Sequence, residues 1–159
     1  MAFTISGTSG INLGTQPLAG VLPDANAPSG SVIQVVQGLY IVQQSTTSTS
    51  FVASGITASI TPSSTSNKVL VEVSFNGVAS SATSFYTIYR DSTNLGSGTN
   101  SCFATLVYVA SDNSVSMRFL DSPATTSSTT YTVYYKASSG SAYTTVQGCS
   151  VINLTEIAA

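Results

Sequence analysis

The sequence predicts an all-β protein: an antiparallel two-sheet β-sandwich, jelly-roll-like, with an extended N-terminal arm. Short runs of alternating apolar and polar residues recur along the chain, turns rich in Ser, Thr, Asn and Gly separate them, and no segment keeps a helical period. A chain of 159 residues suffices for one domain with an apolar core. We therefore expect an anchoring arm over residues 1–30 and a β-sandwich domain over residues 31–159.

The predicted arm is rich in Gly and Pro, and its apolar residues are spaced between turn residues. Such spacing cannot build a core, so we expect an extended segment whose apolar side chains serve as anchors. These anchors are Phe3, Ile5, Ile11, Leu13, Leu18, Val21 and Leu22.

Residues 31–44 begin the predicted sandwich, and neither face of this strand is polar. Ile33, Val35, Leu39 and Ile41 share one side, and Val32, Val36, Tyr40 and Val42 share the other. Gly38 is placed for a β-bulge that could shift the register. One face can enter the sandwich, and a small domain has little else to cover the second. We expect a neighbouring subunit to cover Val32, Val36, Tyr40 and Val42.

The clearest strand is predicted over residues 68–76. Apolar residues at every second position, from Val69 to Phe75, share one face, while Lys68, Glu72 and other polar residues share the opposite one. The dipeptide Asn76-Gly77 tolerates positive φ and predicts a tight turn at the end of the strand.

Further strands are predicted at sandwich-like spacing, which brings the total to about eight. In the run 130–136, Tyr131 and Tyr135 alternate with Val133 and are expected in the core, whereas Tyr134 is a candidate for an exposed contact. The other runs cover residues 55–62, 84–90, 102–111, 114–120 and 143–157.

Composition excludes several classes of partner. Charged residues make up 6% of the chain, against roughly 25% in average globular proteins. The four basic residues cannot provide the positive patch that nucleic acid requires, so no nucleic-acid partner is expected. No apolar run is long enough to span a bilayer and no ordinary signal peptide is recognisable, so no membrane partner is expected. A surface this poor in charge lacks protection against strand-edge pairing, which favours a protein that works in an assembly.

The sequence offers little for catalysis. It has no His, which excludes His-based triads and His-metal sites. The acids Asp91, Asp112 and Asp121 stand beside turn-forming residues at predicted strand ends, where turn formation explains them. No catalytic, cofactor-binding or metal-ligating residue is predicted, no cofactor is expected, and the chain is expected not to be an enzyme. Cys102 and Cys149 could pair, although buried thiols are the favoured interpretation.

Four phrases carry a resemblance to known proteins: "PSGSVIQVVQ" at 28–37, "TSTSFVASGITASITPSSTSNKVLVEVS" at 47–74, "FLDSPATTSSTTYTVYYKAS" at 119–138 and "INLTEIAA" at 152–159. Over residues 28–159 the chain resembles small β domains of tailed-bacteriophage virion surface proteins, which commonly form the C-terminal parts of fibres. The resemblance implies a non-enzymatic structural role on a virus particle, as a homotrimer.

The chain departs from a typical fibre because heptads, collagen-like triplets and repeated shaft modules are missing from it. The arm stands in their place, which favours a capsid decoration, or cement, protein whose partner is the major capsid protein or another virion protein. The expected location is the virion surface, after synthesis in the host cytoplasm. The alternative is the tip of a tail or head fibre that binds a host-surface receptor or glycan through loops 90–101, 111–114 and 121–129.

Overall fold

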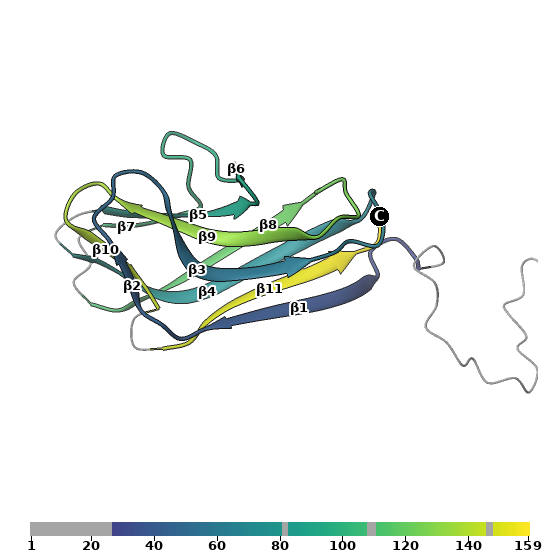
Figure 1. The fold of residues 1–159 in the computed structure, drawn as a ribbon, viewed down its shortest axis with the longest axis horizontal. Helices are drawn as coiled ribbons and strands as arrows, with labels where there is room; N and C mark the ends of the chain where they lie inside the picture. Colours follow the sequence, from purple (N-terminus) through teal and green to yellow (C-terminus); the bar gives the residue numbers. More distant parts are fainter. Residues whose placement is uncertain (1–26, 81–82, 108–110, 146–147) are drawn as a thin grey trace, which may run out of the picture.

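The computed structural model describes residues 27–80, 83–107, 111–145 and 148–159, which form two antiparallel β-sheets packed face to face (Figure 1). The predicted all-β sandwich is therefore confirmed. Of the predicted arm, residues 1–26 lie outside the described residues.

The first sheet, called sheet A, has six strands among the described residues, with β4 at its centre. One edge of β4 pairs with β8. Its other edge pairs with β11 over Lys68–Ser74 and with β10 over Gly77–Ser80. The strands are β1 (Val32–Tyr40), β2 (Gln44–Thr46), β4 (Lys68–Ser80), β8 (Asn113–Asp121), β10 (Ser141–Thr144) and β11 (Ser150–Ile157).

The second sheet, sheet B, has five strands in the described part of the chain. Their order is β3-β9-β5, and β6 and β7 both pair with β5. Its strands are β3 (Val52–Ile60), β5 (Thr83–Arg90), β6 (Thr93–Asn94), β7 (Ala104–Val107) and β9 (Thr129–Ala137).

Eight of these strands form a jelly roll. The order β1-β11-β4-β8 in sheet A faces the order β3-β9-β5-β7 in sheet B. Except for β5 and β7, strands that are adjacent in one sheet are distant in sequence. The predicted jelly-roll-like topology is thus confirmed, and β2, β6 and β10 are short additions to it.

The core lies between the sheets and follows the two-residue period of the strands. In β4, Val69, Val71, Val73 and Phe75 are buried, as predicted. From sheet B, Tyr131 and Tyr135 of β9 are buried in the core, also as predicted. The Tyr135 ring stacks at 6.5 Å on that of Tyr86 from β5.

The predicted turn at Asn76-Gly77 is wrong, because β4 continues to Ser80. A Cβ built on Gly77 would lie 2.8 Å from the Tyr86 hydroxyl. Gly77 is therefore required for the close approach of a side chain from sheet B and does not mark a reversal of the chain.

Two other predicted runs are each divided in the structure. Residues 143–157 contain the end of β10 and the whole of β11, and residues 31–44 contain β1 and the start of β2. Strand β3 begins at Val52, three residues before the predicted start at Gly55. Gly55 has a φ of +81° and lies where the pairing with β9 changes register, which marks a bulge.

The sandwich is elongated, and the C-terminus lies at the same end as residues 27–31 (Figure 1). Hydrogen bonds fix this proximity: the Gly30 amide donates to the Ala158 carbonyl at 2.8 Å, and the Ala158 amide donates to the Ser31 carbonyl at 2.9 Å. The predicted arm therefore joins the domain beside the end of β11.

Candidate functional site

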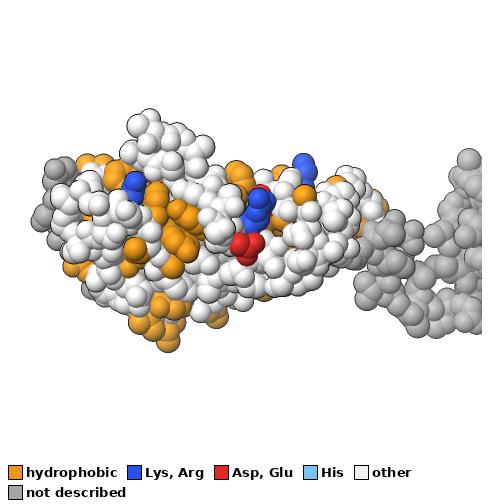
Figure 2. All heavy atoms as spheres, turned by 45° about the horizontal axis from the view of Figure 1, so that its top comes forward, with side chains coloured by type: hydrophobic (Ala, Val, Ile, Leu, Met, Phe, Trp, Pro, Cys, Tyr) orange, Lys and Arg blue, Asp and Glu red, His pale blue; other side chains and the backbone are white. Residues whose placement is uncertain are grey.

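The exposed apolar side chains concentrate on one segment. Among the described residues, five of the seven large apolar side chains that are exposed belong to residues 32–42: Val32, Val35, Leu39, Ile41 and Val42. The other two are Val107 and Leu120. Figure 2 shows apolar side chains projecting at the lower edge of the molecule, where β1 ends in Figure 1. We call residues 32–42 the β1 segment.

The two faces of β1 are the reverse of those predicted. Val36 and Tyr40, expected at a subunit interface, pack against the core. Val35 and Leu39, assigned by prediction to the interior, are 61% and 64% exposed. Val32 and Val42, from the predicted interface, are exposed at 60% and 54%.

A bulge explains the reversal. The register with β11 shifts between Val32 and Gln34, so Ile33 is the extra residue, and Gly38, predicted as the bulge, pairs regularly with Ile152. A Cβ on Gly38 would lie 2.4 Å from the Thr57 carbonyl oxygen of β3. Gly38 therefore permits β1 to pack closely over sheet B.

The outer face of sheet A is arranged in rows that cross its strands. One row is polar: Gln37 donates to Asn153 at 2.9 Å, and Glu72 forms an ion pair of 2.8 Å with Arg118. A neighbouring row is largely apolar and runs through Val35, Thr155, Leu70 and Leu120. Because Glu72 and Arg118 pair with each other, this face offers a partner little unpaired charge.

A buried carboxylate fastens the end of the sandwich where the predicted arm joins. Glu156 of β11 is fully buried, and its Oε1 accepts hydrogen bonds from the Ser63 amide at 2.8 Å, the Ser63 hydroxyl at 2.7 Å and Asn67 Nδ2 at 2.7 Å. Its Oε2 accepts a hydrogen bond from Gln34 Nε2 in β1. Burial alone raises the pKa of Glu156, but the hydrogen bonds from Asn67, Gln34 and Ser63 outweigh it and lower the pKa below 4.5.

An open cavity of about 400 Å³ lies beside this carboxylate. Its lining is formed by small and polar residues of the β3–β4 loop and of both ends of the described domain: Ala27, Ser63, Ser64, Ser66, Asn67, Ala158 and Ala159. The cavity therefore adjoins the exit of the predicted arm.

A second polar cluster closes the same end of the core. Arg90 Nη1 contacts both carboxylate oxygens of Asp121 at 2.9 Å, and the Tyr131 hydroxyl donates to Asp121 Oδ2 at 2.7 Å. Burial and the hydrogen bond to Asp121 raise the pKa of Tyr131. This cluster joins β8 of sheet A to β5 and β9 of sheet B.

The three acids considered for catalysis have separate structural roles. Asp91 has a φ of +50° and its Oδ1 accepts a hydrogen bond from the Thr130 amide, as a turn residue does. Asp121 is not the predicted turn residue, because it is buried in the ion pair with Arg90. Asp112 is exposed and precedes the first residue of β8, whereas Asp121 is the last. The structure does not gather the three around one cleft.

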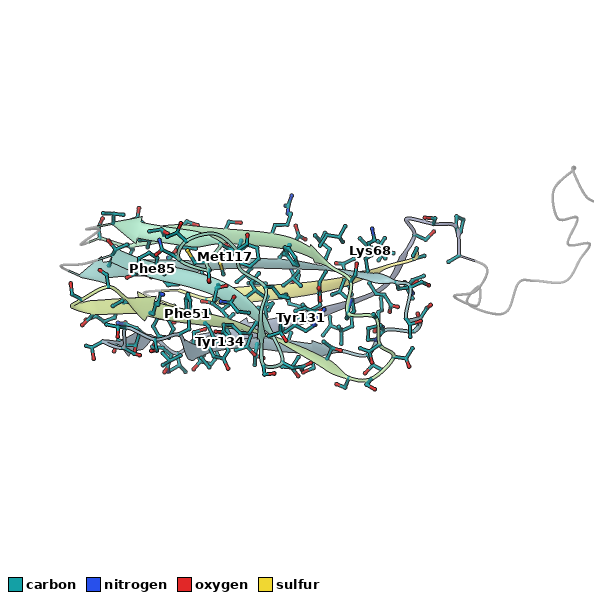
Figure 3. The ribbon with its side chains drawn as sticks, turned by 90° about the horizontal axis from the view of Figure 1, so that it is seen from above. Phe51, Lys68, Phe85, Met117, Tyr131 and Tyr134 are labelled. Atoms are coloured by element: carbon teal, nitrogen blue, oxygen red, sulfur yellow. The ribbon has the colours of Figure 1, made fainter. Side chains whose placement is uncertain are left out.

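Aromatic side chains gather on the outer face of sheet B. Tyr134, the predicted exposed contact, is half-buried there and stacks on Tyr89 with ring centroids 3.9 Å apart. The Lys136 ammonium lies 4.5 Å from the centroid of Phe51 and 5.2 Å from that of Phe85. Figure 2 shows apolar side chains beside a cation on this face, and Figure 3 shows Phe51, Phe85 and Tyr134 near one another. We call Phe51, Phe85, Tyr89 and Tyr134 the aromatic shelf.

The predicted recognition loops do not converge. Loop 90–101 folds over the outer face of sheet B, where Asn94 Oδ1 accepts a hydrogen bond from the Thr87 hydroxyl at 2.6 Å and Thr87 is fully buried. Loops 111–114 and 121–129 flank opposite ends of β8, so they lie at opposite ends of the sandwich (Figure 1). A receptor could not contact all three loops at one tip.

The arm anchors Phe3, Ile5, Ile11, Leu13, Leu18, Val21 and Leu22 lie outside the described residues. Cys102 and Cys149 are free, and the predicted burial is wrong for Cys149, which is exposed, and only partial for Cys102. Within the described part of the chain, no group of three or more Cys, Asp or Glu side chains could hold a metal ion, and no helix could cross a membrane.

No family model matches the chain, and no curated protein matches its sequence.

Proposed function

We propose that the protein is a non-enzymatic structural protein of a bacteriophage virion: a homotrimeric capsid decoration protein whose N-terminal arm binds the shell. The observation that carries this proposal is the exposed apolar β1 segment, which begins directly after the predicted arm and indicates a protein that works in an assembly. The threefold order of the proposed assembly rests on the resemblance and not on this segment. Soluble monomers rarely expose contiguous apolar patches, and larger patches mark interaction sites. The resemblance of residues 28–159 to phage virion domains supports a virus particle as the assembly in which the protein works.

The arm supplies the attachment in this proposal. Its seven apolar anchors fall into groups of one or two that Gly or Pro residues separate, so they cannot form a core by themselves. Addition of an extended segment to a sheet edge provides main-chain hydrogen bonds, and pockets for alternate side chains provide specificity. A fully buried anchor contributes about 1.5–3 kcal/mol.

The test is co-sedimentation with capsids from which the native protein has been stripped. The Leu18→Ser/Val21→Ser double variant should keep its β circular-dichroism spectrum and bind these capsids at least tenfold more weakly than the parent, since two anchors are lost. The matched control is Val107→Ser, which removes an exposed apolar side chain from the domain. Equal binding of the parent and the double variant would exclude the arm as the anchor.

The aromatic shelf favours a second candidate, the tip of a fibre that binds a host-surface glycan or protein. Tyrosine and phenylalanine are enriched at recognition surfaces, and hydroxyl pairs such as Ser59 with Thr130, at 2.8 Å, lie on the same face of sheet B. Adherence of the recombinant protein to host cells, lost in Tyr134→Ala, would support the fibre tip over the decoration protein.

A further inference from the structure

The free edge of β1 lacks the features by which other sheet edges avoid pairing. Among the residues that the structure describes, β1 pairs only with β11, and from Gln34 to Tyr40 it carries no charge, no Pro and no register shift. By contrast, β8 at the opposite edge of sheet A carries Arg118 and Asp121, and β3 at the edge of sheet B is interrupted by a bulge near Gly55. Unprotected, uncharged edges are the ones that pair with another chain.

The β1 segment is self-complementary about Gln37. If two antiparallel copies are aligned with Gln37 opposite Gln37, then Val35 lies opposite Leu39 and Gln34 opposite Tyr40, because each pair of residue numbers has the same sum. Val35 and Leu39 both belong to the exposed outer face. Beyond these pairs, Ile41 and Val42 of one copy approach the exposed Val32 of the other. In this alignment each exposed apolar side chain meets an apolar neighbour.

The polar row across sheet A continues through the same contact. Gln37 is hydrogen-bonded to Asn153, which lies opposite Glu72, and Glu72 pairs with Arg118. Two Gln37 amides that face each other can exchange hydrogen bonds without burying charge. The polar rows would then meet at the axis, flanked on both sides by contacts between Val35 and Leu39.

We propose that two copies of the protein associate through antiparallel pairing of their β1 strands about a twofold axis at Gln37, which joins the two A sheets into one continuous sheet. This goes beyond the proposed function, because a threefold assembly does not require a twofold contact. A contact of this kind is isologous and closes on itself. If trimers also form, it links a copy of one trimer to a copy of another.

Charged substitutions of Gln37 in the full-length protein test whether the two Gln37 side chains face each other at the proposed twofold axis. In Gln37→Lys two ammonium groups would face each other, and in Gln37→Glu two carboxylates would. Like charges opposite each other weaken a strand pair, so we expect the dissociation constant from sedimentation equilibrium to rise at least about fivefold in each variant. An equimolar mixture should recover the parental constant, and native mass spectrometry should find mixed pairs. Ser116→Lys and Ser116→Glu, on the exposed face of β8, are matched controls and should leave association unchanged.

The outcomes separate this contact from the proposed trimer. Even-numbered assemblies with rescue in the mixture support the twofold contact, and a dimer without higher species would also overturn the trimer. A trimer that is insensitive to both Gln37 variants would refute the twofold contact and leave the proposed function intact. A monomeric parent at micromolar concentration would refute both. Weakening by both variants without rescue would show that Gln37 does not face its own copy, which also refutes the proposal.

Discussion

Replacing Glu156 with Gln should destabilise the domain at neutral pH and remove part of its sensitivity to acid. The carboxylate is fully buried and accepts three hydrogen bonds at Oε1 and one at Oε2, all from neutral donors. An amide provides only one acceptor oxygen. If that oxygen takes the place of Oε1, the new NH2 group faces Gln34 Nε2. Both groups are hydrogen-bond donors, so the bond between these two residues is lost.

The magnitude follows from these bonds. Each hydrogen bond to a charged group contributes about 1.5–3 kcal/mol, and a neutral one about 1 kcal/mol. Losing one bond and weakening three costs about 5 kcal/mol, but the variant also avoids burying a charge, which costs several kcal/mol. We expect a net loss of about 2 kcal/mol, or a Tm lower by about 4–8 °C for a chain of this size.

The dependence on pH has a definite sign. Because folding lowers the pKa of Glu156 below 4.5, its contribution to stability is present above pH 4.5 and is lost as the pH falls through the folded-state pKa. Protonated Glu156 resembles Gln, because its O–H group is also a hydrogen-bond donor and the groups around it are donors as well. The difference in stability between the parent and Glu156→Gln should therefore shrink in acid.

Urea unfolding at pH 7 and at successively lower pH measures both effects. Glu72→Gln is the matched control: its ion pair with Arg118 is largely exposed and should contribute about 0–1 kcal/mol. Equal stability of the parent and Glu156→Gln at pH 7 would refute the account of the buried carboxylate. A difference that stays constant through the acid range would refute its link to ionisation.

Three further changes test other parts of the structure. Arg90→Met leaves Asp121 buried without its cation and should lower the free energy of unfolding in urea by about 2–3 kcal/mol. Gly38→Ala forces a Cβ against the Thr57 carbonyl and should cost about 1–3 kcal/mol, measured as a lower Tm. Burial raises the pKa of Tyr86 to about 12. The contribution of Tyr86 to folding stability should therefore be intact below pH 10 and be lost as the pH rises through 12. In urea unfolding at alkaline pH, the stability of Tyr86→Phe should fall less steeply with pH than that of the parent.

The pattern of the sequence was sufficient for the sheets, because a two-residue period needs only the residues themselves. Val69 to Phe75 of β4 and Tyr131 to Tyr135 of β9 are placed as predicted. The error at Asn76-Gly77 has a different origin. The same glycine suits a turn or the close approach of a distant side chain, and only the packing of Tyr86 against β4 distinguishes them.

The faces of β1 could not be assigned from the sequence because both are apolar and a bulge exchanges them. One extra residue, Ile33, turns every later side chain of the strand to the opposite face. The local sequence favours a bulge at Gly38, because glycine tolerates bulge geometry, and nothing in it indicates Ile33. The structural role of Glu156 could not be predicted from the sequence either. The role depends on hydrogen bonds from Gln34, Ser63 and Asn67, which are distant from Glu156 in the sequence.

The buried Glu156 cluster lies where the predicted arm meets the domain, so it affects how firmly the arm is connected to the sandwich. Gly30 and Ser31 are hydrogen-bonded to Ala158, and Gln34 reaches Glu156, so the residues after the predicted arm are fastened to β11. Beyond them, β1 pairs with β11 along the rest of its length. A pull on the arm along the strand would have to break several of these bonds together before β1 could slide. If the arm binds the shell as proposed, weakening Glu156 should therefore loosen the attachment point before it opens the core.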